Sequence, residues 1–529
     1  MPRFISAENL RRFWREGREV ALFDLREEGP YAEAHPLWAV SLPLSEIEVR
    51  IEALVPRRSA PIVVYDDGEG FAAAGAARIA ALGYADVAVL EGGLAAYARV
   101  GEVYRDVNVP SKAFGELVES IRHTPSLPAP EIKAILEREP NVVVLDSRRY
   151  EEFTTMAIPR GQSVPGGELV YRVHDLAPSP DTLVIVNCAG RTRSIIGTQS
   201  LVNACIPNRV VALRNGTIGW TLAGLEVETG RTLRAPEPSE AGKARARAAA
   251  ARWADKVGVP VIDAAGLDRL IADSDRRTLH RLDVRTPEEH AAGHPEGFVS
   301  APGGQLVQAT DEWVAVRGAR LVLYDTDGVR ARMTASWLVQ LGWETYVVEA
   351  GALAADARPA PRKVRDFGLG PDDFVAPATL LAEPSRFVVF DLARSPAYRK
   401  GHIRGAWHAS GPRLADQVAG EQARGLAAGR TLVLTSPDGE LAAANLAVAR
   451  AAASGDVRVL AGGTAAYAAA GGRLDSQEAH WLGVPDDIYK RPYEGTDNPR
   501  AAMQGYIDWE LQLVAQLAND GIAGFHVVR

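Results

Sequence analysis

The sequence predicts an α/β fold in which one small domain occurs four times in tandem, each copy a mainly parallel sheet flanked by helices. The first observation is a short apolar strand that ends in an aspartate and occurs four times, at Asp24, Asp146, Asp283 and Asp391. The second is a loop that follows another apolar strand, 42 residues later in three copies and 45 residues later in the fourth. Repetition of these elements at matched spacing predicts a tandem array.

Each copy contains the same elements in the same order. A helical pattern comes first, as in "APEIKAILEREP" at 129–140, and the strand that ends in aspartate follows. Next come a second apolar strand, a loop, a helical segment and a third strand that ends at a glycine, as in "VVALRNG" at 210–216. Near-continuous apolar strands are typical of strands covered on both faces, and their alternation with helices predicts a mainly parallel sheet.

The domain boundaries follow from these elements. They predict copies at residues 1–118, 119–250, 251–366 and 367–475. We call these the first to fourth copies. The C-terminal extension, 476–529, has a different pattern, an aromatic-rich loop followed by a helix from about Pro499 to Asn519. Two interpretations of this extension are open: a helical strap packed over the fourth copy, or a lid over a site.

Composition limits the possible partners and the compartment. The chain has 529 residues and a net charge of −8, which argues against nucleic acid or an anionic membrane as its main partner. Two cysteines cannot form a secreted disulfide framework, and no stretch approaches the roughly 18 apolar residues of a membrane span. The N-terminus lacks the apolar core of a signal peptide. We therefore expect a cytoplasmic protein that binds neither nucleic acid nor membrane.

The loop in "VIVNCAGRTRSIIG", at 184–197, carries the candidate chemistry. Cys188 ends a buried strand, and Arg193 follows five residues later, just before a helical pattern for which Ser194 is a good N-cap. A helix N-terminus and two guanidiniums favour a thiolate, and such settings lower a thiol pKa from about 8.5. We predict that Cys188 is a nucleophile that forms a persulfide. Six loop residues are predicted to contact substrate: Ala189, Gly190, Arg191, Thr192, Arg193 and Ser194.

The other three copies carry no thiol at this position. Asp66, Asp325 and Ser436 replace the cysteine, and their loops are acidic, so these copies are predicted to be inactive scaffolds. Cys205, near the end of the helix after the active loop, is interpreted as a small core residue, with a resolving thiol as the alternative. Asp146 and Arg148 are predicted to form a structural ion pair.

Cofactor signals are missing from the sequence. His402 and His408 are interpreted as turn residues rather than metal ligands, because their spacing alone does not indicate a site. No glycine-rich phosphate loop and no Cys-x2-Cys pair occurs. We expect neither a cofactor nor a metal.

Together these features resemble the rhodanese (thiosulfate sulfurtransferase) family over residues 5–475. The shared marks are the Asp-x-Arg after the first core strand, the turn "GHIRGAWH" after Asp391, the cysteine loop, and the glycines that follow the next strand. The second copy departs from the family in reading "MAIPRGQSVPGG" where Gly-His is expected. The resemblance implies a small α/β domain around a parallel sheet. The family also has two-domain members with a silent first and an active second domain, and the first and second copies look similar to such a pair. A folded fragment that ends near residue 250 is therefore expected to retain some sulfurtransferase activity.

Three functions compete for this site. The first is a sulfurtransferase that takes sulfane sulfur from thiosulfate or a related anionic donor and passes it to a thiol or to cyanide. The second is a phosphatase or arsenate reductase on the related fold, which uses a longer Cys-x5-Arg loop, whereas here the sixth residue after the cysteine is Ser194. The third is a non-catalytic sulfur carrier or partner-binding module. Loop length favours sulfur over phosphate and does not separate a carrier from an enzyme.

Overall fold

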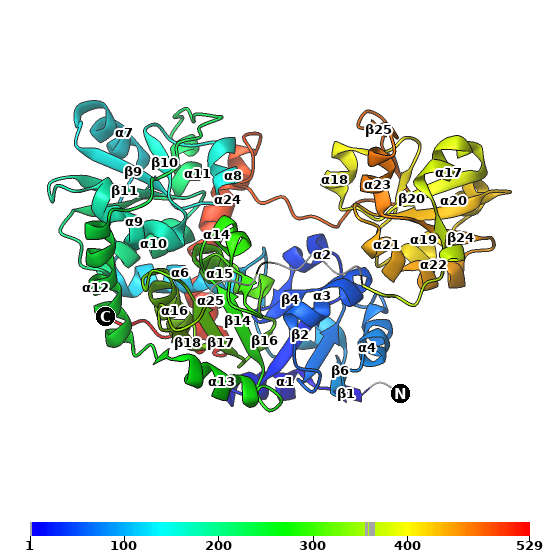
Figure 1. Ribbon diagram of the computed structural model, residues 1–529, viewed down its shortest axis with the longest axis horizontal. Coiled ribbons are helices and arrows are strands. Elements are labelled where there is room, and N and C mark those ends of the chain that lie inside the picture. Colours follow the sequence, from blue (N-terminus) through cyan, green and yellow to red (C-terminus); the bar gives the residue numbers. More distant parts are fainter. Residues whose placement is uncertain (1–2, 355–357, 359–364) are drawn as a thin grey trace. The chain divides into compact units, whose positions relative to one another are not determined.

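The computed structural model describes residues 3–354, 358 and 365–529, and these residues form two compact units (Figure 1). Unit one contains residues 3–9, 21–107 and 365–489, and unit two contains residues 10–20, 108–354, 358 and 490–529. The expected boundary near residue 118 falls inside a helix of unit two, and the one near 366 lies beside residues 359–364, outside the described residues. Each unit is described by itself below.

Unit two contains two parallel sheets with the same strand order. In the second copy the order is β10 (Gly161–Ser163), β9 (Val142–Asp146), β11 (Leu183–Asn187), β12 (Val210–Leu213) and β8 (Ser126–Leu127). In the third copy it is β15 (Val299–Ser300), β14 (Leu279–Asp283), β17 (Arg320–Tyr324), β18 (Glu344–Val348) and β13 (Val261–Ile262). Because the third strand lies at one edge and the first at the other, the connections must cross over the sheet, and helices supply these connections.

Unit one repeats this order twice. The strands of the first copy pair in the order β4 (Ala39–Ser41), β2 (Val20–Asp24), β5 (Ile62–Tyr65), β6 (Val87–Leu90) and β1 (Arg3–Ile5). Those of the fourth copy pair in the order β22 (Trp407–His408), β20 (Phe387–Asp391), β23 (Thr431–Thr435), β24 (Val457–Leu460) and β19 (Phe374–Val375). All these pairs are parallel, which confirms the predicted α/β class with mainly parallel sheets.

Helices cover both faces of the sheet in the second copy. They are α7 (Ala129–Arg138), α8 (Tyr150–Thr155), α9 (Leu169–Leu176), α10 (Thr192–Asn203) and α11 (Gly216–Leu222), with α12 (Glu240–Val257) packed on α9. Side chains of β11 alternate between two cores: Val184 and Val186 face one, Leu183 and Ile185 the other. A strand buried on both faces explains why the sequence shows a continuous apolar run there.

The pairing of copies differs from the expectation. Unit two joins the second copy to the third, because Met333 lies in the same buried core as Val184, and the indole of Trp337 donates to Ser200 Oγ at 2.8 Å. Trp337 and Met333 lie on α16 (Arg330–Gln340). The expectation that the first and second copies form a complete unit is therefore wrong. The repeated sequence marks each copy but carries no signal about which copies share a core.

A fragment that ends at residue 250 is now expected to lose sulfurtransferase activity. It lacks α16, which supplies part of the core of the second copy, and it lacks the C-terminal helices of unit two. Activity with thiosulfate and circular dichroism, measured on the fragment and the full chain, check this. A folded fragment with activity comparable to the full chain would contradict the expectation.

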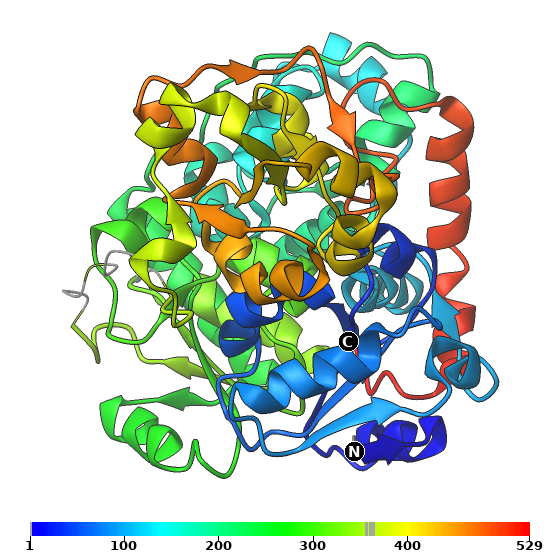
Figure 2. The ribbon, with the colours of Figure 1, turned by 90° about the vertical axis from the view of Figure 1, so that its right-hand side faces the viewer.

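The C-terminal extension divides between the two units. Residues 476–489 belong to unit one, where β26 (His480–Trp481) pairs with β22 of the fourth copy. Residues 490–529 belong to unit two, where α24 (Arg500–Glu510) contacts α11 and α6 (Val109–Arg122), and α25 (Leu513–Asp520) also packs on α6. Figure 2 shows α24 and α25 in red as one extended helical run. The interpretation as a helical strap over the fourth copy is therefore wrong, because the part that joins this copy is an edge strand and the helices pack within unit two.

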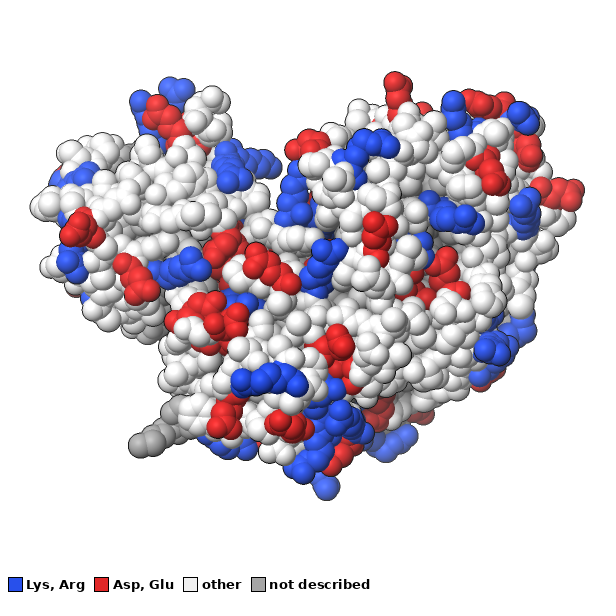
Figure 3. All heavy atoms as spheres, turned by 180° about the vertical axis from the view of Figure 1, so that it is seen from behind, with Lys and Arg blue, Asp and Glu red and all other residues white. Residues whose placement is uncertain are grey.

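Two surface properties bear on partners. Among the described residues, no helix combines the length and the apolar character needed to cross a membrane. On the face seen in Figure 3, basic and acidic side chains are interspersed, so this face presents no extended field of one sign.

Candidate active site around Cys188

The candidate nucleophile lies where β11 ends and α10 begins. Asn187, the last residue of β11, pairs in register with Asp146 at the end of β9. Parallel strands bring their carboxyl ends to one edge of the sheet, so Cys188 and the loop after it lie at this edge. Helix α10 begins at Thr192, which makes Ser194 the third residue of the helix. The prediction that Ser194 is the N-cap is therefore wrong.

Backbone N–H groups of helix α11 bind carbonyl groups of the loop. The Thr217 N–H donates to the Cys188 carbonyl at 2.8 Å, and the Ile218 N–H donates to the Ala189 carbonyl at 2.9 Å. Gly216 has a φ of 54°, and a Cβ at this position would lie 2.5 Å from the Cys188 carbonyl oxygen. Glycine is therefore required there for both conformation and space. These two bonds fix the start of the loop against the start of α11.

The thiol itself is closed off from solvent. Cys188 is 1% exposed, and its sulfur lies 3.3 Å from Ser194 Oγ. Burial raises the pKa of the Cys188 thiol above its ordinary value, Arg193 and hydrogen bonds with Ser194 lower it, and Glu510 raises it further. The expected low pKa is therefore not found in this closed arrangement, because burial outweighs the positive charge. A sulfur donor can reach this thiol only if a covering group moves.

The aligned loops of the other copies have the same internal bond. In each, the residue at the cysteine position accepts from the backbone N–H six residues later: Asp66 from Ala72 at 2.8 Å, Asp325 from Ala331 at 2.8 Å, and Ser436 from Ala442 at 3.3 Å. In the second copy the N–H six residues later is that of Ser194, and this N–H is one of the groups that lower the pKa of the Cys188 thiol. The four loops thus share a backbone N–H that can donate to an anion. In the first, third and fourth copies a side-chain oxygen of the loop itself accepts from this N–H.

Arg191 is fully occupied by protein groups. Its Nε and one terminal nitrogen donate to the two carboxylate oxygens of Glu116 at 2.7 and 2.8 Å, and it also pairs with Glu119. Its other terminal nitrogen donates to Asn215 at 2.8 Å. Because every guanidinium nitrogen has a protein acceptor, this side chain ties the loop to α6 and to the turn before α11.

Arg193 has a different environment. Both of its terminal nitrogens donate to Glu152 at 2.7 Å, and this is its one hydrogen-bonding side chain among the described residues. Burial acts to raise the pKa of Glu152, but the neighbouring Arg193 lowers it more strongly. The pKa of Glu152 therefore lies well below its usual range. Of the two loop arginines, Arg193 is the one whose charge lowers the pKa of Cys188. Arg193 is therefore the loop arginine with the larger electrostatic effect on the thiol.

The third copy offers an internal comparison for Arg193. Arg330 occupies the aligned position, 137 residues later, and likewise donates from both terminal nitrogens to Glu289, at 2.6 and 2.7 Å. Arg330 also pairs with Asp327 at 2.7 Å and with Glu168 of the second copy at 2.8 Å. Arg330 is thus held by three carboxylates and Arg193 by one. The arginine in the copy that carries the thiol is therefore paired with fewer carboxylates than the arginine in the third copy.

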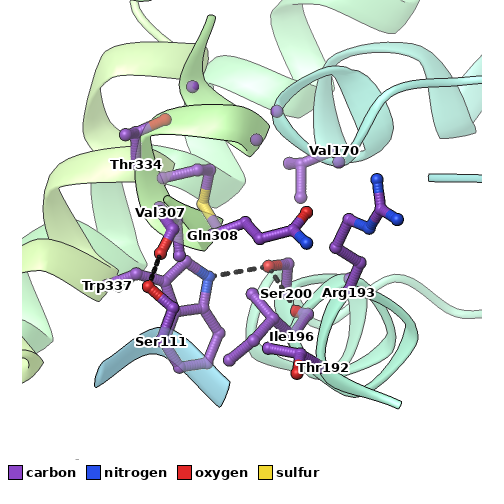
Figure 4. A pocket seen from close by; sticks show the side chains of 16 residues that line it. Ser111, Val170, Thr192, Arg193, Ile196, Ser200, Val307, Gln308, Thr334 and Trp337 are labelled. Atoms are coloured by element: carbon purple, nitrogen blue, oxygen red, sulfur yellow. Dashed lines mark hydrogen bonds between the residues drawn. The ribbon is translucent and has the colours of Figure 1, made fainter. Parts of the chain in front are cut away.

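A small cavity borders Arg193 between the second and third copies (Figure 4). Its volume is about 40 Å³, and its walls are mostly apolar, with Val170, Ile196 and Trp337 among them. The Gln308 side chain points into this space toward Arg193, and its Oε1 is buried without a hydrogen-bond partner among the described residues. A cavity of this volume can hold a few water-sized groups.

Other predicted residues have structural places. Arg148 donates to both carboxylate oxygens of Asp146 at 2.8 and 2.7 Å, which confirms the structural ion pair. Cys205 is exposed and follows the end of α10 with a φ of 53°, so the interpretation as a core residue is wrong. Twelve helical residues span about 18 Å, which also separates Cys205 too far from Cys188 for a resolving thiol. His402 lies in strand β21 (His402–Ile403) and not in a turn, and its two ring nitrogens lie 2.8 Å from the backbone carbonyls of Tyr398 and Glu478.

Sequence reasoning missed the acidic residues around the loop. Glu116, Glu152 and Glu510 lie 72, 36 and 322 positions from Cys188, and no local motif links them to it. An unpaired buried arginine is unfavourable, so the two loop arginines did indicate that acidic partners exist, but not which ones. Among the described residues, no group of three or more histidine, cysteine or carboxylate side chains is placed to hold a metal ion.

Comparisons with known proteins identify the family of the chain, although the family-model matches do not include the Cys188 loop. A family model described as the rhodanese-like domain matches residues 6–99, 264–355 and 378–470. A crystal structure described as thiosulfate sulfurtransferase from Pseudomonas aeruginosa is 50% identical to this chain, covers 100% of both chains and has a TM-score of 0.93.

Two shorter structures match single segments. They are the Alr3790 protein from Anabaena sp. and the BH2092 protein from Bacillus halodurans, with 24% and 21% identity. They cover 20% and 21% of this chain and 86% and 85% of their own, each with a TM-score of 0.19. The comparison with curated proteins finds no match.

Proposed function

The chain belongs to the rhodanese-like family, and on this premise we propose that it is a sulfurtransferase with Cys188 as its nucleophile. The Cys188 thiolate attacks the outer sulfur of thiosulfate, the sulfur–sulfur bond of the donor breaks, and sulfite leaves with the electron pair. The enzyme then holds a Cys188 persulfide. A thiol or cyanide attacks the outer persulfide sulfur and restores the thiolate.

The observation that carries this proposal is the common geometry of the four loops. In each loop a backbone N–H faces the side chain that lies six residues before it. Only in the second copy is that side chain a thiol. A carboxylate or hydroxyl oxygen occupies this position in the other copies and cannot carry sulfur, whereas a thiolate can use the same N–H group and exchange sulfur. The first, third and fourth copies are accordingly proposed to be inactive scaffolds, within the ranges 1–118, 251–366 and 367–475.

The loop residues have distinct proposed roles. We assign the sulfonate end of the donor to Arg193. This side chain has fewer hydrogen-bonding side-chain partners than Arg191, and it borders the cavity. The backbone of Ala189, Gly190 and Thr192 surrounds the transferred sulfur, and Ser194 contacts it through its N–H and hydroxyl. Arg191 is proposed to shape the loop from α6.

Loop length supports sulfur chemistry over phosphate chemistry. Arg193 comes after four intervening residues, one fewer than the Cys-x5-Arg loops that enclose a tetrahedral oxyanion. Neither of the two cysteines forms a disulfide, which fits the proposed location in a reducing cytoplasm.

A donor panel tests the proposal. The full chain is exposed separately to thiosulfate, 3-mercaptopyruvate and glutathione persulfide, and its intact mass and peptide masses are then measured. We expect one added sulfur atom on Cys188 with at least one donor, and release of that sulfur on addition of cyanide or a thiol. A chain that gains no sulfur from any of them overturns the proposed function, and one that gains sulfur without multiple turnovers is a carrier.

A further inference from the structure

A buried carboxyl group from the C-terminal helix lies against the Cys188 loop and has no part in the proposed reaction. Glu510, the last residue of α24, is 0% exposed. Its Oε1 accepts from the Tyr506 hydroxyl at 2.7 Å and from the Thr192 hydroxyl at 3.4 Å. Its Oε2 is buried and has no hydrogen-bond partner among the described residues. A buried carboxylate oxygen without a partner is costly, so a group that completes it is required.

The free oxygen points at the centre of the loop. A Cβ built on Gly190 would lie 3.7 Å from Glu510 Oε2 and 3.1 Å from a ring carbon of Tyr506. Gly190 is therefore the residue that lets α24 approach, and the approach brings a carboxyl group to the loop that surrounds the thiol. The electrostatic influence of Glu510 reaches the Cys188 sulfur itself.

Charged groups from α6 and from the Cys188 loop act on Glu510. Burial and then Glu116 of α6 raise the pKa of Glu510 to about 8, whereas Lys112 of α6, the Tyr506 hydroxyl and Arg191 of the loop lower it. At neutral pH most of the population therefore carries a proton, and the free Oε2 is the oxygen with room for it. In this form Glu510 presents an O–H donor toward the loop instead of a negative charge.

We propose that Glu510 is a specificity-determining residue that admits an anionic sulfur donor when protonated and excludes it when ionised. This rests on the proposed function. The thiolate and a thiosulfate dianion together bring three negative charges to one buried loop, and the protonated carboxyl donates a hydrogen bond to them. The ionised carboxylate adds a fourth negative charge where little solvent screens it, and like charges in such a place repel strongly. A neutral donor has no such dependence.

The test compares an anionic and a neutral reagent at the same thiol. Full-length wild type and Glu510→Gln are alkylated with iodoacetate and with iodoacetamide between pH 6.5 and 9.5, and the rate at Cys188 is followed by mass spectrometry. The ratio of the two rates cancels the thiolate fraction, because both reagents need the thiolate. In wild type the iodoacetate-to-iodoacetamide ratio should fall about tenfold between pH 7 and pH 9, following the protonated fraction of Glu510. In Glu510→Gln the ratio should stay constant.

Two further variants distinguish a local effect from a general one. Tyr506→Phe removes a hydroxyl that lowers the pKa of Glu510, so the fall in the ratio should move to higher pH. Asp508→Asn removes an acidic charge from the exposed face of the same helix, and its profile should match wild type. Identical profiles for wild type and Glu510→Gln overturn the proposal, as does a fall in the ratio that Glu510→Gln retains.

Alkylation does not depend on sulfur transfer, so the two proposals can fail separately. If thiosulfate gives no persulfide but the alkylation ratio behaves as expected, the function is wrong and the role of Glu510 stands. If thiosulfate is turned over and the ratio is flat in wild type, the function stands and the role of Glu510 is wrong.

Discussion

Cys188→Ser is expected to abolish sulfur transfer, with a loss of at least about a thousandfold in turnover of thiosulfate. Serine is close to cysteine in size, so it fits the buried position beside Ser194 with little disturbance of the loop. Its hydroxyl cannot accept sulfane sulfur to form a persulfide, and it is not ionised at neutral pH. Thiocyanate formation from thiosulfate and cyanide measures turnover, and the intact mass shows whether any sulfur is bound.

Cys205→Ser is the matched control for this variant. It makes the same substitution at the other thiol, which is exposed and lies at the far end of α10. Its turnover and its sulfur adduct should match wild type. Sulfur found on Cys205, or full turnover by Cys188→Ser, would contradict the assignment of the nucleophile.

The fold was predictable because its signals lie within short stretches of the chain. The strand that ends in aspartate is one such signal, and it occurs at Asp24, Asp146, Asp283 and Asp391. In the first three copies this aspartate forms a buried ion pair with the arginine two residues later. Strands buried on both faces give continuous apolar runs, so their number and order could be read from the sequence. Which copies share a core could not, because contacts such as Trp337 with Ser200 join residues 137 positions apart.

The site was predictable only in part, for the same reason. The loop at 188–194 is contiguous, so its thiol and its arginines are visible in the sequence. The acidic residues around the loop are not: Glu116 of α6 and Glu152 of α8 pair with the arginines, and Glu510 of the C-terminal helix accepts from Thr192. The ion pairs affect the acidity of the thiol. Two unpaired arginines would lower the pKa of Cys188, whereas beside two paired arginines burial has the largest effect on this pKa and raises it. The sequence therefore predicts Cys188 as the candidate nucleophile, whereas the low pKa expected for its thiol is not found in the buried site.

The other large effect is expected at Arg193. We expect Arg193→Ala to lower kcat/KM for thiosulfate roughly ten- to a hundredfold, because a hydrogen bond to a charged group contributes about 1.5–3 kcal/mol and each 1.4 kcal/mol is a factor of about ten. Glutathione persulfide has no sulfonate at the reacting end, so its loss should be smaller. The ratio of kcat/KM for the two donors, measured for wild type and variant, isolates the sulfonate contact from any general damage.

Arg330→Ala supplies the matched control for that ratio. It makes the same substitution at the aligned position of the third copy, where the arginine pairs with Glu168, Glu289 and Asp327 and no thiol is present. We expect this variant to be less stable to heat, because it leaves buried carboxylates without their partner, yet to keep the wild-type donor ratio in its folded fraction. If Arg193→Ala slows both donors alike and shifts the pH profile instead, then Arg193 acts only by stabilising the Cys188 thiolate, and the sulfonate of the donor is bound elsewhere.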